Sequence, residues 1–462
     1  MTGNVLRLPD GRLAVPGNRW DLVPDSSRAR RPFVSVIIPY YDGREQLDLV
    51  LEGLALQDYP AERFEIVVVD DGSPEPLARP DTGPGQARIR TLRQEDRGFR
   101  AAAARNLGAS VAQGEVLCFL DQDTVPGPAY LRRLIRLPAT VPDALVVGRR
   151  RHVDLRDWTP ARLRSWLTGT GPAPTEFDPP GWLAEAYRDR ADLLITDDTS
   201  YRFVISAVMS CSAQLFQEIG GFDESFTRYG GEDWELAFRA YNAGAVLAHE
   251  PTAVAWHDGP DWAERGDPDE RRRDQAEQQR ALARLLPATV RIGTDPPQTP
   301  PGPAELIVTW TNTAGIDPAR LSTGVRALLD SPGRPTIYLD PGQLQRCDLP
   351  TGTERAFTGP PPPAVLARAL DLIRLDGDGE PAPDDLILVR DRLRTGAAGR
   401  VRLHSSGSAA VAPVLIGVAL RAERRAARWQ IFAPEVDLIE ALFGNDDVDS
   451  GQLSDNCPID EI

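Results

Sequence analysis

Short apolar runs alternate with longer stretches in which apolar residues recur every three to four positions over residues 33–260. The short runs predict strands that are buried on both faces of a sheet, and the three-to-four spacing predicts helices. Strands that alternate with helices imply right-handed βαβ units, and therefore an α/β fold with a mostly parallel, Rossmann-like sheet covered by helices on both faces. The predicted strands span residues 34–38, 64–69, 89–93, 116–120, 144–147 and 201–212, and the predicted helices span 45–57, 98–111 and 232–241.

The alternation resumes after a proline-crowded stretch and predicts a second, smaller α/β domain of unknown role. Its strands are expected at residues 305–311, 336–339 and 386–389, and its helices at 318–329, 364–375 and 411–429. Prolines in the preceding stretch predict a semi-rigid linker, and the acidic end of the chain predicts a disordered tail. The expected divisions are an N-terminal extension (1–32), a main domain (33–260), a polar helix and Pro-rich linker (261–304), the small domain (305–440) and the tail (441–462).

The N-terminal extension contains Pro9-Asp10-Gly11 between two short apolar runs, which predicts a hairpin packed on the main domain. In the small domain, His404-Ser405-Ser406-Gly407 is the one run suggestive of chemistry, and a loop explains it better.

The composition of the chain argues against several classes of protein. The formal net charge of −16 argues against a nucleic-acid surface, which would need a basic stripe. All 52 basic residues are arginine, and this excludes a Schiff-base lysine and the phosphate-binding lysine of a P-loop. We find no apolar run of membrane-spanning length, no leader segment and no closely spaced pair among the four cysteines. These features together predict a cytoplasmic protein without a transmembrane segment or a structural zinc site.

Acidic residues follow several predicted strands. Asp121-Gln122-Asp123 comes directly after the run at 116–120, Asp42 follows the first strand, and Asp70 and Asp71 close the second. Because a parallel sheet aligns the carboxyl ends of its strands on one edge, these side chains could converge on one ligand. Two carboxylates one residue apart can hold a divalent cation and, through it, a diphosphate. As an alternative to ligand binding, each of these aspartates taken alone could be an ordinary turn or N-cap residue.

An irregular segment at residues 150–200 carries several large aromatic side chains among prolines and charges. Aromatic faces stack on sugars or apolar groups, so the segment could form a wall for an acceptor. It could equally be an insertion whose aromatic residues pack on one another. The residues concerned are Trp158, Trp166, Trp182 and Tyr187.

Two further positions carry candidate chemistry. Asp233 lies in the first turn of the predicted helix that begins at Glu232, where the helix dipole favours acidic residues. A carboxylate held there and aimed into a cleft is also a good general base. His257 ends an apolar run and is one of only four histidines, so it is a candidate ligand as well as an ordinary structural residue.

Seven stretches, taken together and in order, resemble the inverting family 2 glycosyltransferases over residues 33–258. The form of the sixth stretch is closest to bacterial polysaccharide-synthesising and galactosyltransferase-like members. The stretches are V-S-V-I-I-P-Y-Y-D (34–42), V-V-V-D-D-G-S (67–73), G-F-R-A-A-A-A-R-N-L-G (98–108), F-L-D-Q-D (119–123), G-G-F-D-E (220–224), G-G-E-D-W-E-L-A-F-R (230–239) and W-H (256–257).

The resemblance implies the GT-A nucleotide-diphosphosugar transferase fold, a UDP-sugar or similar donor, and Mn²⁺ or Mg²⁺ held at a D-x-D motif. It implies that Pro39, Tyr41 and Asp71 hold the base of the nucleotide, and that the nucleotide side of the cleft is lined by Arg100, Arg105 and Asn106. It implies metal or ribose contacts for Asp121 and metal ligation by Asp123 and His257. Finally, it implies that Asp233, with Glu232 beside it, deprotonates the acceptor hydroxyl.

The acceptor itself stays open between polysaccharide, lipid-linked, peptide and small-molecule partners. An alternative keeps the fold but makes the chain a nucleotidyltransferase or a sugar-nucleotide binding module. The related nucleotidyltransferases carry a glycine-rich loop and a lysine near the start, whereas this chain has Pro39-Tyr40-Tyr41-Asp42 and no lysine. We therefore expect a metal-dependent, inverting glycosyltransferase.

Overall fold

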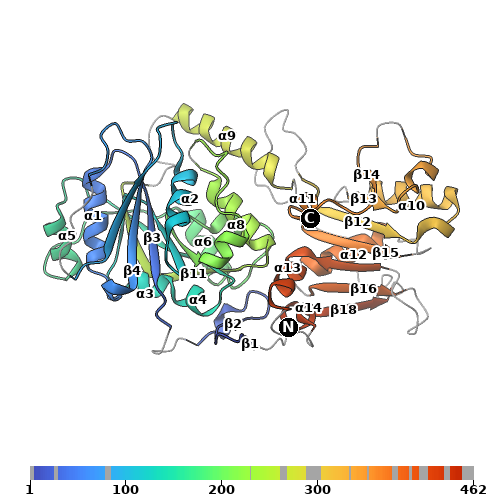
Figure 1. Cartoon of the computed structure of the whole chain (residues 1–462), viewed down its shortest axis with the longest axis horizontal. Coiled ribbons are helices and arrows are strands. Elements are labelled where there is room, and N and C mark those ends of the chain that lie inside the picture. Colours follow the sequence, from blue (N-terminus) through green and yellow to red (C-terminus); the bar gives the residue numbers. More distant parts are fainter. Residues whose placement is uncertain are drawn as a thin grey trace.

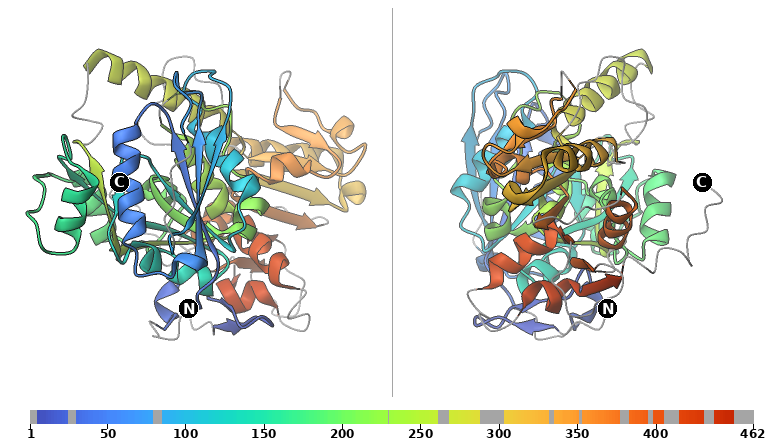
Figure 2. Two further views of the ribbon diagram at one scale, coloured as in Figure 1. Left: turned by 60° about the vertical axis from the view of Figure 1, so that its left-hand side comes forward. Right: turned by 90° about the vertical axis from the view of Figure 1, so that its right-hand side faces the viewer.

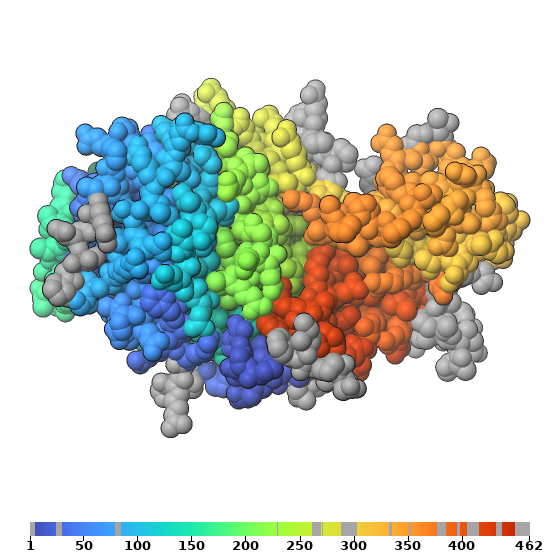
Figure 3. All heavy atoms as spheres, in the orientation of Figure 1, coloured from blue at the N-terminus to red at the C-terminus, as the bar shows by residue number. Residues whose placement is uncertain are grey.

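The computed structural model describes residues 5–24, 30–78, 85–228, 230–260, 268–287, 303–331, 335–350, 353–376, 383–394, 398–404, 415–430 and 437–449. Within these residues the chain forms two α/β regions that lie side by side along the long axis of the molecule (Figures 1 and 3). We call residues 34–258 the first region and residues 306–449 the second region. Helix α9 (Pro268–Leu285) stands between them in the sequence.

The first region is built on a sheet that has nine strands among the described residues, in the order β5-β4-β3-β6-β10-β8-β11-β7, with β9 paired to β8. Strands β3, β4, β5 and β6 run parallel, as do β8 and β11, whereas β7, β9 and β10 pair antiparallel with their neighbours. The strands are β3 (Val34–Tyr40), β4 (Phe64–Asp70), β5 (Arg88–Arg93), β6 (Val116–Leu120), β7 (Thr124–Pro126), β8 (Ala144–Val153), β9 (Glu176–Phe177), β10 (Val208–Ser212) and β11 (Val246–Asp258).

Helices cover both faces of this sheet, with α1 and α2 on opposite sides of the strands (Figure 2). Helix α2 approaches β3 closely because Gly108 has no side chain: a Cβ there would lie 2.6 Å from Ile37 Cγ2. The helices are α1 (Arg44–Ala55), α2 (Ala101–Val111), α3 (Tyr130–Leu134), α4 (Arg136–Thr140), α5 (Pro160–Leu167), α6 (Gly181–Asp189), α7 (Ala213–Glu218) and α8 (Glu232–Asn242). The mixed α/β architecture predicted for this region is confirmed.

One strand prediction in this region is wrong in part. Residues 201–212 do not form a single strand, since Ser200–Phe203 make a 3₁₀ turn and β10 begins only at Val208. The turn buries Tyr201 and Phe203 against the core of the region. The apolar residues at these positions are therefore explained by burial and not by a strand.

The second region has its own sheet, of seven strands among the described residues, in the order β14-β13-β12-β15-β17-β16-β18. Most of its buried apolar side chains form a cluster separate from that of the first region. Its strands are β12 (Leu306–Thr311), β13 (Thr336–Leu339), β14 (Ala356–Thr358), β15 (Asp371–Asp376), β16 (Arg400–His404), β17 (Leu415–Ala419) and β18 (Asn445–Asp449), and its helices are α10 (Pro318–Asp330), α11 (Pro363–Leu366), α12 (Pro383–Arg394), α13 (Leu420–Trp429) and α14 (Leu438–Phe443).

Several element types predicted for this region are wrong. The expected helix at 364–375 is the short α11 followed by β15, the expected strand at 386–389 lies inside α12, and the expected helix at 411–429 contains β17. A short apolar run suits either a buried strand or a buried helix, so periodicity could not separate them. The chain from Asn445 to Asp449 is also a strand rather than a tail, and Asp446 pairs with Arg392 at 3.4 Å. Residues 450–462 and 405–414 lie outside the described residues.

The N-terminal segment forms the predicted hairpin, with β1 (Leu6–Arg7) antiparallel to β2 (Leu13–Ala14). It contacts both regions rather than the first alone (Figure 1). Leu8 and Ala14 belong to the apolar cluster of the second region, whereas Val15 belongs to that of the first.

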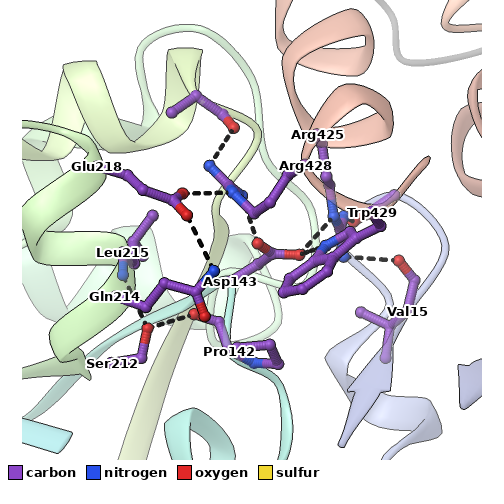
Figure 4. A network of polar contacts seen from close by, with 12 residues as sticks. Val15, Pro142, Asp143, Ser212, Gln214, Leu215, Glu218, Arg425, Arg428 and Trp429 are labelled. Carbon is purple, nitrogen blue, oxygen red and sulfur yellow. Dashed lines mark hydrogen bonds and ion pairs between the residues drawn. The ribbon is translucent and has the colours of Figure 1, made fainter. Parts of the chain in front are cut away.

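A buried ionic network joins the two regions at this segment (Figure 4). Asp143, just before β8, accepts hydrogen bonds from Arg425 Nε (3.1 Å) and Trp429 Nε1 (2.7 Å) of α13 and also contacts Arg428. Arg425 donates in addition to the backbone oxygens of Val15 (2.8 Å) and Gly17 (2.6 Å). Since Arg425 is 0% and Asp143 1% exposed, neither charge has water as a substitute partner.

None of the helices in the described part of the chain combines the length and the apolar character needed to cross a bilayer.

Candidate active site

A cleft of about 780 Å³ opens at the carboxyl ends of β3, β4 and β6, opposite the first turn of α8. This is the edge at which open α/β sheets bind ligands. Most of the predicted site residues line it, namely Pro39, Tyr41, Asp71, Arg105, Asp121, Asp123, Glu232 and Asp233. Arg100, Asn106 and His257 are outside the lining.

The two aspartates that follow β4 have different surroundings. Asp70 turns into its own loop, where it accepts hydrogen bonds from the backbone nitrogens of Ser73 (2.8 Å) and Leu77 (3.1 Å). Asp71 lines the cleft and accepts a hydrogen bond from the backbone nitrogen of Arg100 (2.8 Å). Burial raises the pKa of Asp71 despite this hydrogen bond. Asp71 is therefore the one of the pair that is placed to meet a ligand.

Arg105 of α2 connects the D-x-D segment to the start of α8. Its guanidinium, 4% exposed, donates to Asp121 Oδ1 (2.8 Å) and to Glu232 Oε1 (3.0 Å). Burial works to lower the pKa of Arg105, but the two carboxylates outweigh it and hold the pKa above its ordinary value. The positive charge is thus fixed between two acidic groups that both line the cleft.

Asn106, next along α2, holds a turn outside the cleft lining. Its side-chain amide donates to Phe222 O (2.9 Å) and Glu224 Oε1 (3.0 Å) and accepts from Phe222 N (2.9 Å). The Arg100 guanidinium lies 3.8 Å from Glu224 of the same turn. In this structure both side chains therefore tie the G-G-F-D-E turn to α2.

Helix α8 begins where two glycines allow a left-handed backbone. Gly230 and Gly231 have φ values of 92° and 98°, which residues with a Cβ rarely adopt. The turn that they form places Asp233 in the cleft wall, where its Oδ1 accepts a hydrogen bond from Trp234 N (2.8 Å). Burial, and then the neighbouring Glu232 carboxylate, raise the pKa of Asp233 to about 7. A carboxylate with such a pKa can accept a proton near neutral pH.

Asp123 and His257 are brought together although they are far apart in the sequence. Strand β7 pairs antiparallel with β11 and sets Thr124 opposite His257. As a result Asp123 Oδ1 lies 3.1 Å from His257 Nδ1. Two neighbouring ligands of a small octahedral cation, each about 2.1 Å from it, lie about 3 Å apart, so the pair fits a divalent cation.

The described side chains do not complete a metal site by themselves. Among the described residues, no three side chains of the His, Cys, Asp and Glu types gather closely enough to hold an ion. Asp121, the third predicted ligand, pairs with Arg105 instead. An ion held by Asp123 and His257 would take its remaining oxygen ligands from water or from a bound substrate.

Sequence reasoning missed two contributions to the cleft. Gln122 lies between the two aspartates of the D-x-D segment. Its side-chain amide accepts a hydrogen bond from Tyr41 N (2.7 Å) and donates one to Tyr41 O (3.0 Å). Helix α9 contributes Asp274, Gln275 and Gln278 to the lining. The polar, arginine-rich pattern of α9 gave no sign that it would cover a cleft.

The aromatic residues of the segment at 150–200 divide between the two roles considered for them. Trp166 packs between Trp158 and Trp256, with ring centroids 5.7 and 4.6 Å away, and Tyr187 is buried. Trp182 differs, because it is 51% exposed and lines the cleft. Most aromatic residues of this segment therefore pack within the protein, and Trp182 alone of the four forms part of the cleft wall.

Comparison with known proteins finds similarity to glycosyltransferases. Residues 35–213 match the model of glycosyl transferase family 2, and residues 196–252 match that of the N-terminal domain of galactosyltransferase. The validoxylamine A glucosyltransferase of Streptomyces hygroscopicus subsp. jinggangensis is 34% identical over 232 residues, which are 47% of this chain and 53% of the relative. The Pasteurella multocida hyaluronan synthase is 26% identical over 247 residues, 49% of this chain and 24% of the synthase.

The pre-mycofactocin glycosyltransferase of Mycobacterium tuberculosis is 30% identical over 238 residues, 51% of this chain and 44% of that protein. Among solved structures, a Pyrobaculum calidifontis mannosyltransferase in complex with GDP-Man and Mn²⁺ aligns at 22% identity and a TM-score of 0.38, over 60% of this chain and 71% of its own. The match spans about half or less of the length of these curated relatives.

The cleft therefore combines the D-x-D segment at the carboxyl edge of the sheet with the acidic start of α8. The match to the model of glycosyl transferase family 2 covers residues 35–213, all of which lie in the first region. The second region lies beyond both family matches.

Proposed function

We propose that the cleft transfers a sugar from a nucleotide diphosphosugar, a UDP-sugar, to an acceptor hydroxyl with inversion at the anomeric carbon. The observation that carries this proposal is Asp233, a partly buried carboxylate whose pKa is raised to about 7, in the wall of a cleft that also holds Asp71, Asp121 and Asp123. The relatives support sugar transfer as the activity, since they include a glucosyltransferase and a hyaluronan synthase.

The donor would bind along the ends of β3, β4 and β6. Tyr41, held by Gln122, and the buried Asp71 flank the position proposed for the nucleotide base. Arg105 keeps Asp121 oriented, so that the segment presents Asp121 toward the ribose. Asp123 and His257 would hold Mn²⁺ or Mg²⁺, and such an ion supplies Lewis-acid stabilisation of the leaving diphosphate.

Asp233 would act on the acceptor side. Its carboxylate takes the proton of the acceptor hydroxyl while the hydroxyl oxygen forms a bond to the anomeric carbon. The bond from that carbon to the diphosphate breaks, and the nucleoside diphosphate leaves with the electron pair. Glu232 stays ion-paired to Arg105 and raises the proton affinity of Asp233 through its negative charge. One base and one displacement give inversion without a covalent intermediate.

The experiment that tests the function is a donor panel measured by calorimetry in the presence of Mn²⁺, followed by donor turnover. We expect one nucleotide diphosphosugar to bind and to be hydrolysed slowly without acceptor. Binding without any turnover, with or without acceptors, would favour the sugar-nucleotide binding module instead.

The pH dependence of transfer follows from the pKa of Asp233. Its carboxylate must be deprotonated to accept the hydroxyl proton, and burial raises that pKa to about 7. We expect kcat/KM for the acceptor to rise about tenfold per pH unit below pH 7 and to level off above it. Steady-state kinetics between about pH 5 and pH 9 check this, and a flat profile over that range would contradict the base assignment.

Donor affinity tests the cation pair. Removing Mn²⁺ with a chelator, or changing Asp123 to Asn, is expected to weaken binding of the nucleoside diphosphate by at least about tenfold, because the diphosphate loses its bridge to the protein. Calorimetry with UDP measures the effect without any turnover. Asp58→Asn, an exposed change outside the cleft lining, serves as the matched control. Equal UDP affinity with and without the ion would contradict the assignment.

A further inference from the structure

A second cavity of about 760 Å³ adjoins the cleft. Trp182 and Trp234 line both cavities, and Trp234 is the residue next to the proposed base. A typical pocket for a small ligand measures about 300–1,000 Å³, so each cavity can hold a ligand unit of its own. An acceptor that places a hydroxyl at Asp233 would therefore have an adjoining space for a further part of the same molecule.

The second cavity offers a ring-stacking face backed by packed aromatic residues. Trp182, near the start of α6, lies against Phe203 with ring centroids 6.3 Å apart, and Phe203 is buried. Because Trp182 is still 51% exposed, much of its surface is available to a ligand. The indole is thus supported on one side and open on the other, the arrangement in which aromatic side chains receive flat apolar faces such as those of sugar rings.

Charged side chains supply much of the remaining wall, beside Ala186 and Ile195. Glu185 and Asp189 of α6 and Arg190 and Arg202 border the cavity. The Arg190 and Arg202 guanidinium groups both lie over the Phe203 ring, 5.1 and 4.9 Å from its centroid, so they border the same aromatic face that supports Trp182. Such a mixture of aromatic faces and charged groups suits a polyhydroxylated ligand, whereas an acyl chain would need apolar walls throughout.

We infer that the acceptor of this protein is a carbohydrate of at least two rings, with one ring at Asp233 and the next stacked on Trp182 in the adjoining cavity. This inference rests on the proposed function and adds the class of acceptor to it. Trp182 is then a specificity-determining residue: it binds the outer ring and takes no part in the chemical step.

The test uses the full chain, a defined panel of mono-, di- and trisaccharides as acceptors, and the donor identified by calorimetry. We expect di- or trisaccharides to be glycosylated and monosaccharides to be used at least about tenfold less well in kcat/KM, since a single ring at Asp233 leaves the adjoining cavity empty. Trp182→Ala should raise KM for the disaccharide about tenfold with little change in kcat, and Trp182→Phe, which keeps a stacking face, should stay within about threefold.

Two controls separate the possible failures. Phe357→Ala removes an exposed aromatic residue of the second region and should leave all acceptor constants unchanged. Circular dichroism and the unfolding temperature of Trp182→Ala, compared with those of the natural protein, show whether the variant is folded. Absence of donor turnover in the natural protein would overturn the proposed function. If the donor is turned over, any of three results would overturn the two-ring inference. The three are equal use of monosaccharides and disaccharides, use of no saccharide at all, and an unchanged KM for the disaccharide in Trp182→Ala.

Discussion

Asp233→Asn is expected to lower kcat for sugar transfer roughly 10³-fold, within the range of about 10²–10⁴ that a general base contributes. The amide keeps the size and the hydrogen bond to Trp234 N but cannot take up the proton of the acceptor hydroxyl. Donor affinity should stay within about twofold, because the donor residues on β3, β4 and β6 are untouched. Initial rates at saturating donor and acceptor, together with calorimetry of the donor, measure both quantities.

The same variant has a stability signature that a misfolded protein would not show. The Asp233 carboxyl has a pKa of about 7 when folded, above the value of about 3.9 for an unfolded chain. Folding therefore favours the protonated form: the contribution of this group to stability is present below about pH 4 and is lost as pH rises toward 7. Above pH 7 Asp233→Asn should unfold at a higher temperature than the natural protein.

Asp58→Asn is the control for both readouts, since Asp58 is exposed and makes only a surface ion pair with Arg132. It should change neither kcat nor the unfolding temperature by a measurable amount. If Asp233→Asn transfers sugar at a rate within about tenfold of that of the natural protein, Asp233 is not the general base.

Asp143→Ala is expected to destabilise the protein by about 3–5 kcal/mol, the usual cost of removing one partner from a buried ion pair. Arg425 would remain with no exposed surface and would keep the two backbone oxygens of the N-terminal segment and the Phe443 ring, 5.6 Å from its guanidinium carbon, as partners but no carboxylate at Asp143. Trp429 Nε1 would lose its acceptor as well. The free energy of unfolding in urea, measured above pH 7, checks the prediction.

Asp348→Ala is the matched control, because it removes an arginine-paired aspartate whose side chain is 96% exposed. A surface pair of this kind contributes at most about 1 kcal/mol. If Asp143→Ala costs no more than Asp348→Ala, the network in Figure 4 is not what holds the two regions together.

The first region could be predicted from the sequence because its strands are buried on both faces and end in polar residues. The run at 116–120 became β6 with the same bounds, and the D-x-D segment after it lines the cleft as expected. In the second region, residues 386–389 read equally well as a strand or as part of a helix, and only packing against the sheet decides between them.

Within the site, the residue types were easier to predict than their partners. Nothing in the spacing indicates that Arg105 reaches both Asp121 and Glu232, which are 16 and 127 residues away. The contribution of α9 was also hidden, because Asp274 and Gln278 lie on a polar helix whose position over the cleft depends on tertiary contacts. The local sequence pattern is enough to predict where the strands end. Which residues of other elements lie opposite those ends depends on long-range packing.

The Asp143–Arg425 contact has a consequence for synthesis of the chain on the ribosome. The two residues are 282 positions apart, and at about 5–20 residues per second the arginine is made roughly 15–55 s after the aspartate. During that interval the nascent first region carries an acidic side chain whose final burial depends on residues not yet translated. Translation order thus delays the last step of its folding until α13 has emerged.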